Sequence, residues 1–177
     1  GADPDLATWS GRTPLLAAVS TGAPANAQLL IAGGADVAAR SRRGETALLT
    51  AVESERIGLA RALLRAGADP DAASSDGRTP LGRAAAAGDL GLIDLLLDEG
   101  ADPARPARDG ASALMQAARA GSAVVIRRLA AADADPDART PEEGWTALMF
   151  AANRGHLAAV AALLEIGADP NLVGEDG

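Results

Sequence analysis

A glycine recurs along this chain of 177 residues at an almost constant interval. The interval is 33 residues, apart from one step of 34 residues between Gly110 and Gly144. The recurring glycines are Gly11, Gly44, Gly77, Gly110, Gly144 and Gly177. A period of this length predicts a row of similar structural units, each in contact with its neighbours only. We therefore expect no single central core, because such a row buries its apolar surface between adjacent units.

Each of the first five glycines opens a short phrase, which runs Gly11-Arg-Thr-Pro-Leu15 in the first unit and Gly144-Trp-Thr-Ala-Leu148 in the last. Each unit closes on a second phrase, such as Gly67-Ala-Asp-Pro70. We predict a single domain over residues 1–177, with a partial repeat at each end. Its five complete repeats are expected at about residues 8–40, 41–73, 74–106, 107–140 and 141–173.

A hydroxyl side chain precedes an apolar stretch in every unit, where its oxygen can cap the first turn of a helix. These N-cap residues are Thr13, Thr46, Thr79, Ser112 and Thr146. Pro14 and Pro80 follow two of them, at the first helical position, which suits proline. The short helices predicted here should end at left-handed caps. The expected caps are Gly22, Gly88, Gly121 and Gly155, with Glu55 as a less favourable substitute in the second unit.

A second helix is predicted in each unit. These helices include Leu29–Ile31, Leu59–Leu64, Leu90–Leu97, Val124–Leu129 and Leu157–Leu164. They should stop at Gly34, Gly67, Gly100, Asp133 and Gly167, since aspartate tolerates the left-handed region better than most residues. The Ala-Asp-Pro stretch that follows must be extended, because proline disfavours a helical conformation in the residue before it. We therefore predict an all-α fold of stacked helix-turn-helix units with projecting hairpin-like loops.

The composition narrows the class of protein. It is 48% hydrophobic but only 2% aromatic, so the interior should consist mostly of alanine, leucine, valine and isoleucine. The net charge of −8 argues against nucleic acid as a partner. No apolar run approaches the ~18 residues of a membrane span and no leader peptide precedes Gly1, so we expect a soluble chain without a membrane partner. Every basic residue is arginine, which suggests a GC-rich, bacterial source.

The repeated phrases resemble the ankyrin repeat over essentially the whole chain. The resemblance rests on the Gly-x-Thr-Pro-Leu opening, the paired alanines, Gly155-His156, the paired leucines and the ending Gly167-Ala-Asp-Pro-Asn171. It implies an ankyrin-repeat solenoid. One departure is consistent, because an apolar residue or glycine replaces the histidine that usually follows Thr-Pro-Leu. The replacements are Leu16, Leu49, Gly82, Met115 and Met149, where we expect apolar contact instead of polar bonding.

The chain has few side chains of the kinds that usually take part in catalysis. The chain has one histidine, no cysteine and no tyrosine, and His156 has no visible partner for acid–base chemistry. It occupies the place where the family has a histidine at the start of the second helix, so its expected role is structural. No glycine-rich phosphate-binding string occurs. We therefore predict no enzyme activity and no cofactor.

A cluster of acidic residues in the fourth and fifth units is a candidate metal site. Its members are Asp133, Asp135, Asp137, Glu142 and Glu143. The three aspartates alternate as in the opening of a calcium-binding loop. Ala138, however, stands where that loop needs glycine, and Gly144 stands where it needs a bidentate glutamate. We expect a solvated loop, one residue longer than the others, and no metal.

The resemblance implies that the chain binds another protein through its loop tips and the concave face of its first helices. Residues mapped onto this surface are Trp9, Arg12, Arg40, Arg42, Arg43, Glu45, Asp76, Arg78, Arg108, Arg119, Trp145 and Arg154. With Arg139, nine of the 16 arginines fall on or beside it, so the face should be more basic than the chain as a whole. Arginine and tryptophan are enriched among interface hot spots. We expect a monomer that binds a partner protein with an acidic segment.

The alternative is an architectural role, as a spacer or self-associating part of a longer repeat protein. The fifth unit lacks the polar outer side of a terminal repeat, and Asp176-Gly177 begins another unit. Its interior-like residues are Leu148, Met149, Phe150, Val160, Leu163 and Leu164. We expect either a longer array or a covered last face.

Overall fold

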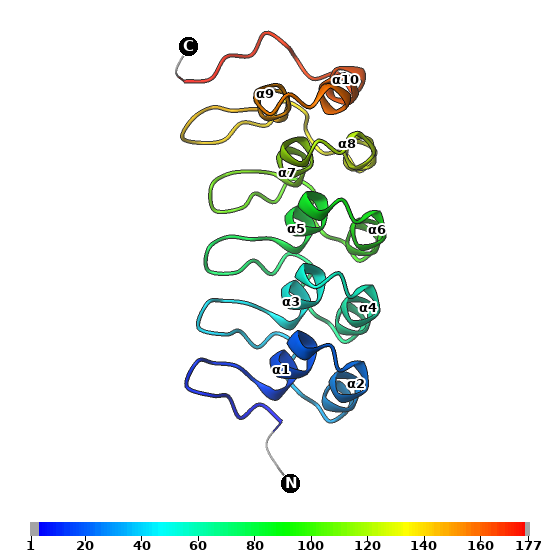
Figure 1. Cartoon of the computed structure of the whole chain (residues 1–177). Helices are drawn as coiled ribbons and strands as arrows, with labels where there is room; N and C mark the ends of the chain where they lie inside the picture. Colours follow the sequence, from blue (N-terminus) through cyan, green and yellow to red (C-terminus); the bar gives the residue numbers. More distant parts are fainter. Residues whose placement is uncertain (1–3, 176–177) are drawn as a thin grey trace.

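The computed structural model describes residues 4–175, which form ten helices in five stacked pairs (Figure 1). The helices are α1 (Pro14–Thr21), α2 (Pro24–Ala32), α3 (Ala47–Glu53), α4 (Ile57–Arg65), α5 (Pro80–Ala87), α6 (Leu90–Asp98), α7 (Ala113–Ala120), α8 (Ala123–Ala130), α9 (Ala147–Asn153) and α10 (Leu157–Glu165). No strand occurs in this range. The all-α stack is confirmed, while the repeat boundaries and the single domain stay predictions. Partial repeats are expected at the two ends of the chain. The first of them includes residues 1–3 and the second includes residues 176–177, which lie outside the described residues.

The predicted N-caps are confirmed in all five first helices. The Thr13 hydroxyl oxygen accepts a hydrogen bond from the Leu16 N–H at 3.2 Å, and Thr146 accepts one from the Met149 N–H at 3.4 Å. Thr46, Thr79 and Ser112 do the same three residues ahead. These caps satisfy donors at a helix start that has no other backbone partner. Each repeat therefore fixes the start of its own first helix locally.

The helix ends also follow the prediction. Gly22, Gly88 and Gly121 are left-handed caps, and Gly155 takes the same conformation one residue after the cap of α9. The two non-glycine substitutes adopt it too, with φ of 55° at Glu55 and 60° at Asp133. Such angles cost energy in residues with a side chain. The stack thus holds these two positions in the conformation that the period demands.

Alanines and leucines bury the contact between neighbouring pairs. Leu48, Leu81 and Leu114 are at most 2% exposed, and Ala84 and Ala117 are completely buried. The first helices α1, α3, α5, α7 and α9 contact one another in sequence along the row. Small side chains let these helices approach closely, which explains an interior with few aromatic rings. The single continuous core therefore runs the length of the stack.

The residues that replace the family's histidine lie largely in this core. Leu16, Leu49 and Met115 are at most 5% exposed, so the expected apolar packing is confirmed for them. Met115 adds a polar contact, since its sulfur accepts a hydrogen bond from the Ser112 N–H at 3.4 Å. Met149 is only partly buried, and its sulfur receives the equivalent bond from Thr146. The thioethers thus help to cap their own helices.

Hairpin-like loops precede the first helices and project to one side of the row (Figure 1). We number them first to fifth: residues 4–13, 33–46, 66–79, 99–112 and 131–146. In the second loop, Ser41 and Glu45 are joined by a backbone hydrogen bond of 3.0 Å and the Gly44 N–H donates to Ser41. The other loops close in the same way. Adjacent loops are joined where the Arg42 N–H donates to the Ser10 carbonyl at 3.0 Å.

Glycine is required at the loop tips for two reasons. The φ of Gly77 is +80°, which L side chains rarely adopt. A β-carbon there would also lie 2.2 Å from the backbone nitrogen of Arg108 in the next loop. Gly67, by contrast, has a φ of +89° with no atom within 4 Å of such a carbon. The recurring tip glycine therefore sets how closely successive loops pack.

Aspartates brace every second contact between loops. Asp71 accepts the Asp102 N–H at 3.1 Å, and Asp137 accepts the Asp169 N–H at 2.9 Å. Asp5 binds the Asp36 N–H in the same way. Burial is the largest cause that raises the pKa of Asp71 above its usual range. Within residues 4–175 no group of three or more histidine, aspartate or glutamate side chains is arranged to hold a metal.

The last helix pair leaves apolar side chains uncovered. Leu148, Met149 and Val160 are partly buried, and Leu164 is 46% exposed. With Leu172 they line a hollow of about 280 Å³. Phe150 and Leu163, from the same expected set, are buried. None of the helices in residues 4–175 combines the length and apolar character needed to span a bilayer.

The replacement Gly77→Ala should destabilise the chain more than Gly67→Ala. Both force a side chain into a left-handed backbone, which costs about 1–2 kcal/mol. Gly77→Ala must also displace the fourth loop, and overpacking costs a further 1–3 kcal/mol or so. Urea denaturation followed by circular dichroism measures both losses. Equal losses would show that the loops separate freely and that the tip glycine serves backbone conformation alone.

Candidate binding surface

The loops and first helices together form one long surface. We call it the loop–helix face: the five loops and the exposed sides of α1, α3, α5, α7 and α9. The second helices of each pair lie on the opposite side of the row (Figure 1). Because equivalent positions recur every repeat, side chains separated by one period lie in neighbouring loops. This geometry lets residues that are distant in sequence act together.

A pocket of about 530 Å³ lies between the first two loops. Five predicted residues line it: Trp9, Arg12, Arg42, Arg43 and Glu45. The remaining walls come from the loops and from α1 and α3. They are Ser10, Leu16, Ser20, Ser41 and Thr50. Thr50 was not predicted to face this surface, and Leu16, which is buried, forms only part of the pocket wall. The helical pattern alone does not show which side chains of a first helix line a pocket.

Trp9 is the most exposed aromatic side chain in the described part of the chain, with 82% of its surface accessible. The guanidinium carbon of Arg42 lies 5.2 Å from its ring centroid. This is the geometry of a cation–π contact, which contributes about 0.5–1 kcal/mol at an exposed site. The contact holds an indole ring and a positive charge side by side at the pocket rim.

The arginines of this pocket have no carboxylate partner among residues 4–175. Arg12 donates to the Ser20 hydroxyl, and within the described residues the side chains of Arg42 and Arg43 make no hydrogen bond. All three are exposed. Glu45 is the single acid in the lining. The pocket therefore carries a net charge of +2, from three arginines and one glutamate, in a chain of net charge −8.

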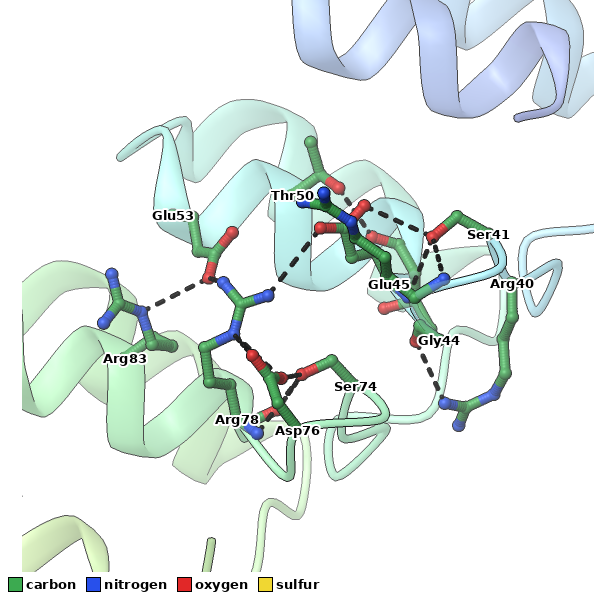
Figure 2. A network of polar contacts seen from close by, with 12 residues as sticks. Arg40, Ser41, Gly44, Glu45, Thr50, Glu53, Ser74, Asp76, Arg78 and Arg83 are labelled. Atoms are coloured by element: carbon green, nitrogen blue, oxygen red, sulfur yellow. Dashed lines mark hydrogen bonds and ion pairs between the residues drawn. The ribbon is translucent and has the colours of Figure 1, made fainter. Parts of the chain in front are cut away.

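The middle of the loop–helix face is different, because its charges are paired (Figure 2). The Arg78 guanidinium contacts Asp76 at 2.9 Å, Glu45 at 3.7 Å and also Glu53. Arg83 adds a second contact to Glu53 at 3.3 Å. These pairs are partly solvated, so each contributes little to stability. Within these pairs the opposite charges of the predicted residues Asp76 and Arg78 balance each other.

The network lowers the pKa of Asp76 from 3.8 to about 2. The main cause is the Ser74 hydroxyl, which donates to the carboxylate, and the second is the Arg78 guanidinium. The same pairing with Asp76 is the largest influence that raises the pKa of Arg78. Both side chains therefore stay charged over the physiological pH range.

Arg40 and Arg139 brace the loops. Arg40 donates to the Gly44 carbonyl at 3.2 Å within its own loop (Figure 2). It also donates to the Ala73 carbonyl at 2.6 Å in the next loop. Arg139 bridges Gly144 and Val173 in the same way. Arg108 makes a longer contact of 3.4 Å with the Ser75 carbonyl. The structure thus gives Arg40, which the sequence pattern assigned to binding, a definite role in holding loops together.

The predicted residues at the far end of the face are also engaged. Trp145 is half-buried, with its ring 5.0 Å from that of Phe150. Arg119 lies 4.0 Å from the same Phe150 ring and 3.4 Å from the Asp109 carboxylate. Arg154, by contrast, is exposed and makes no side-chain hydrogen bond or ion pair within residues 4–175. Trp145 therefore packs within the stack far more than Trp9 does.

His156 has the structural role expected for it. Its Nε2 atom lies within hydrogen-bond distance, 3.1 Å, of the Arg119 carbonyl in the preceding repeat. Arg56 occupies the equivalent position in the second repeat. It donates a hydrogen bond to the Val19 carbonyl in the first repeat. Each side chain ties the turn of one helix pair to the end of a first helix in the pair before it.

Comparison with known proteins agrees with this architecture. A family model described as ankyrin repeats (3 copies) matches residues 1–74, 18–107 and 81–173. The three matches together span most of the chain. No curated protein in the comparison matches it.

The replacement Ser74→Ala should raise the pKa of Asp76 toward 3.8, since it removes the hydrogen bond that lowers this pKa most. Arg78 should keep it below that value. Because the folded-state pKa is depressed, the stabilisation is present above pH 3.8 and is lost as the pH falls through about 2. Carboxyl carbon NMR titration measures the change, with the neighbouring Ser75→Ala as control. An unchanged Asp76 pKa in Ser74→Ala would contradict the assigned cause.

Proposed function

The chain belongs to the ankyrin repeat family, and we propose that it is a non-catalytic module that binds another protein through its loop–helix face. Ankyrin repeats are generally protein–protein interaction modules and are typically not catalytic. The proposal extends this general role to particular residues. It also holds that the chain acts as a monomer and that its partner presents an acidic segment.

The main support for this proposed function is the unpaired positive charge beside Trp9. Arg12, Arg42 and Arg43 are exposed and lack carboxylate partners within residues 4–175, although the chain has an excess of acids. Arginine can bind a carboxylate through two parallel hydrogen bonds, and tryptophan supplies a large rigid contact area. An acidic partner segment would complete the pairing that the chain itself leaves open.

Other observations fit a binding role better than a catalytic one. The one histidine contacts a backbone carbonyl between repeats. The polar side chains of the pocket are three arginines, one glutamate and hydroxyl groups. A hydroxyl nucleophile needs a neighbouring base that can take its proton, and Ser20 instead accepts a hydrogen bond from Arg12. This arrangement suits recognition of charge.

A second candidate function is architectural. The apolar hollow beside α9 and α10 supports it, because Leu148, Met149 and Leu164 are more exposed than their counterparts inside the stack. A spacer or self-associating segment would cover this end with another helical pair. Such a protein would not depend on the arginines of the first two loops.

Site-specific photocrosslinking tests the two functions together. We would place p-benzoylphenylalanine at position 43 on the loop–helix face, at position 65 on α4, or at position 164 beside the apolar hollow. Arg43, Arg65 and Leu164 are all exposed, so each variant should keep the fold. Circular dichroism provides that control.

In a lysate of the source organism, the proposal predicts that position 43 forms an adduct with a distinct protein and that position 65 does not. Adducts only at position 164 would instead support the architectural function. Equal labelling at positions 43 and 65 would contradict a binding surface confined to the loop–helix face.

A further inference from the structure

We propose that the pocket between the first two loops binds an extended acidic peptide that carries an apolar side chain beside its carboxylate. This inference rests on the proposed function and narrows it to one pocket and one chemical class of ligand. The carboxylate would pair with Arg42, Arg43 and Arg12. The apolar side chain would pack against Trp9 and over Leu16 in the pocket wall.

The charge of this pocket is available, whereas that of another hollow along the face is not. That other hollow, between the third and fourth loops, is about 60 Å³ and is lined by Arg78 and Arg83, which contact Glu53, Asp76 and Glu45. A ligand carboxylate arriving there would have to displace an internal one. At the first two loops it would displace only water, so charge complementarity favours that pocket.

Glu45 discriminates between kinds of anion. It lies in the pocket lining and is fixed by hydrogen bonding with the Ser41 hydroxyl at 3.2 Å and by Arg78 at 3.7 Å. A group with two negative charges, such as a phosphate, would meet stronger repulsion from this carboxylate than a group with one. The lining therefore favours a carboxylate of aspartate, glutamate or a chain terminus.

Trp9 supplies the apolar half of the site. The ring is 82% exposed and Arg42 contacts it, so the indole and the guanidinium are presented together. A ligand that only paired with the arginines would leave this apolar surface in water. Burial of apolar area is favourable, so an adjacent apolar side chain adds affinity. The pocket volume of about 530 Å³ is in the usual range for a small ligand-binding site.

Recognition must come from side chains, because the loop backbones are already engaged. The Arg42 N–H donates to Ser10, and the Arg43 carbonyl accepts the Ser75 N–H. A peptide strand could not join these loops edge to edge without breaking those bonds. The ligand would instead lie across the pocket with its side chains directed inward.

A random peptide library displayed on phage is the probe for this inference. The intact chain is used for selection, and the recovered peptides are then measured by fluorescence anisotropy against two double variants. Arg42→Glu with Arg43→Glu reverses the charge of the pocket. Arg61→Glu with Arg65→Glu makes the same change in net charge at exposed positions on α4, away from the loop–helix face. Two single replacements of one residue, Trp9→Ala and Trp9→Phe, test the aromatic contact.

The expected result is enrichment of peptides with an acid next to an apolar residue. Their affinity should fall about tenfold or more in the Arg42/Arg43 variant and change little in the Arg61/Arg65 variant. It should fall in Trp9→Ala and recover in part in Trp9→Phe. Raising the salt concentration should weaken binding, as it does for exposed charges.

Three results would overturn the inference: selection of peptides without acids, equal affinity for both double variants, or no enrichment at all. Peptides that lose affinity only in the Arg61/Arg65 variant would refute the pocket, and the proposed function would still stand if position 43 forms an adduct. Absence of enrichment together with a position 43 adduct would do the same. The proposed function itself fails only if the adduct at position 43 is absent or is matched at position 65.

Discussion

The close approach of each repeat to the next is the constraint on which the rest of the structure depends. Completely buried alanines such as Ala84 and Ala117 allow the first helices to pack tightly, and a tip glycine such as Gly77 leaves room for the following loop. The period then places equivalent side chains beside one another. Arg42 reaches Trp9, and Arg78 reaches Glu45, because both pairs bridge adjacent loops. The stack therefore brings residues that are one repeat apart in the sequence into contact on the surface.

The close approach of the repeats also gives the arginines of the loop–helix face different interaction partners. Arg78 and Arg119 meet carboxylates of the chain, whereas Arg40 and Arg139 donate to backbone carbonyls and connect loops. Among residues 4–175, the side chains of Arg12, Arg42 and Arg43 have no carboxylate partner and donate to no backbone carbonyl of a neighbouring loop. Local positive charge in an acidic protein is therefore concentrated at one end of the surface. That concentration, more than the number of arginines, is what supports a site there.

The sequence alone was sufficient for much of the fold, and the physical reason is local. A hydroxyl such as that of Thr13 caps a helix three residues ahead, and the left-handed positions extend even to Glu55 and Asp133. These features depend on neighbours in the chain and on the repeat period, both visible in the sequence.

The roles of single surface residues were harder to predict. Arg40 braces a carbonyl 33 residues away, and Trp145 packs on Phe150 while Trp9 stays exposed. The contact of Arg78 with Glu53 spans 25 residues and joins a loop to a helix end. Such outcomes depend on side-chain reach across the gap between repeats, which a pattern of residue types does not contain. The site was therefore predicted as a face, and the structure divides it.

Binding at the pocket between the first two loops can be tested by hydrogen–deuterium exchange of the chain, alone and with its crosslinked partner protein bound. We expect protection of the first two loops, around Trp9 and Arg42, and of the adjoining starts of α1 and α3, with α4 and α6 unchanged. Protection confined to α9 and α10, or spread over the second helices, would contradict it.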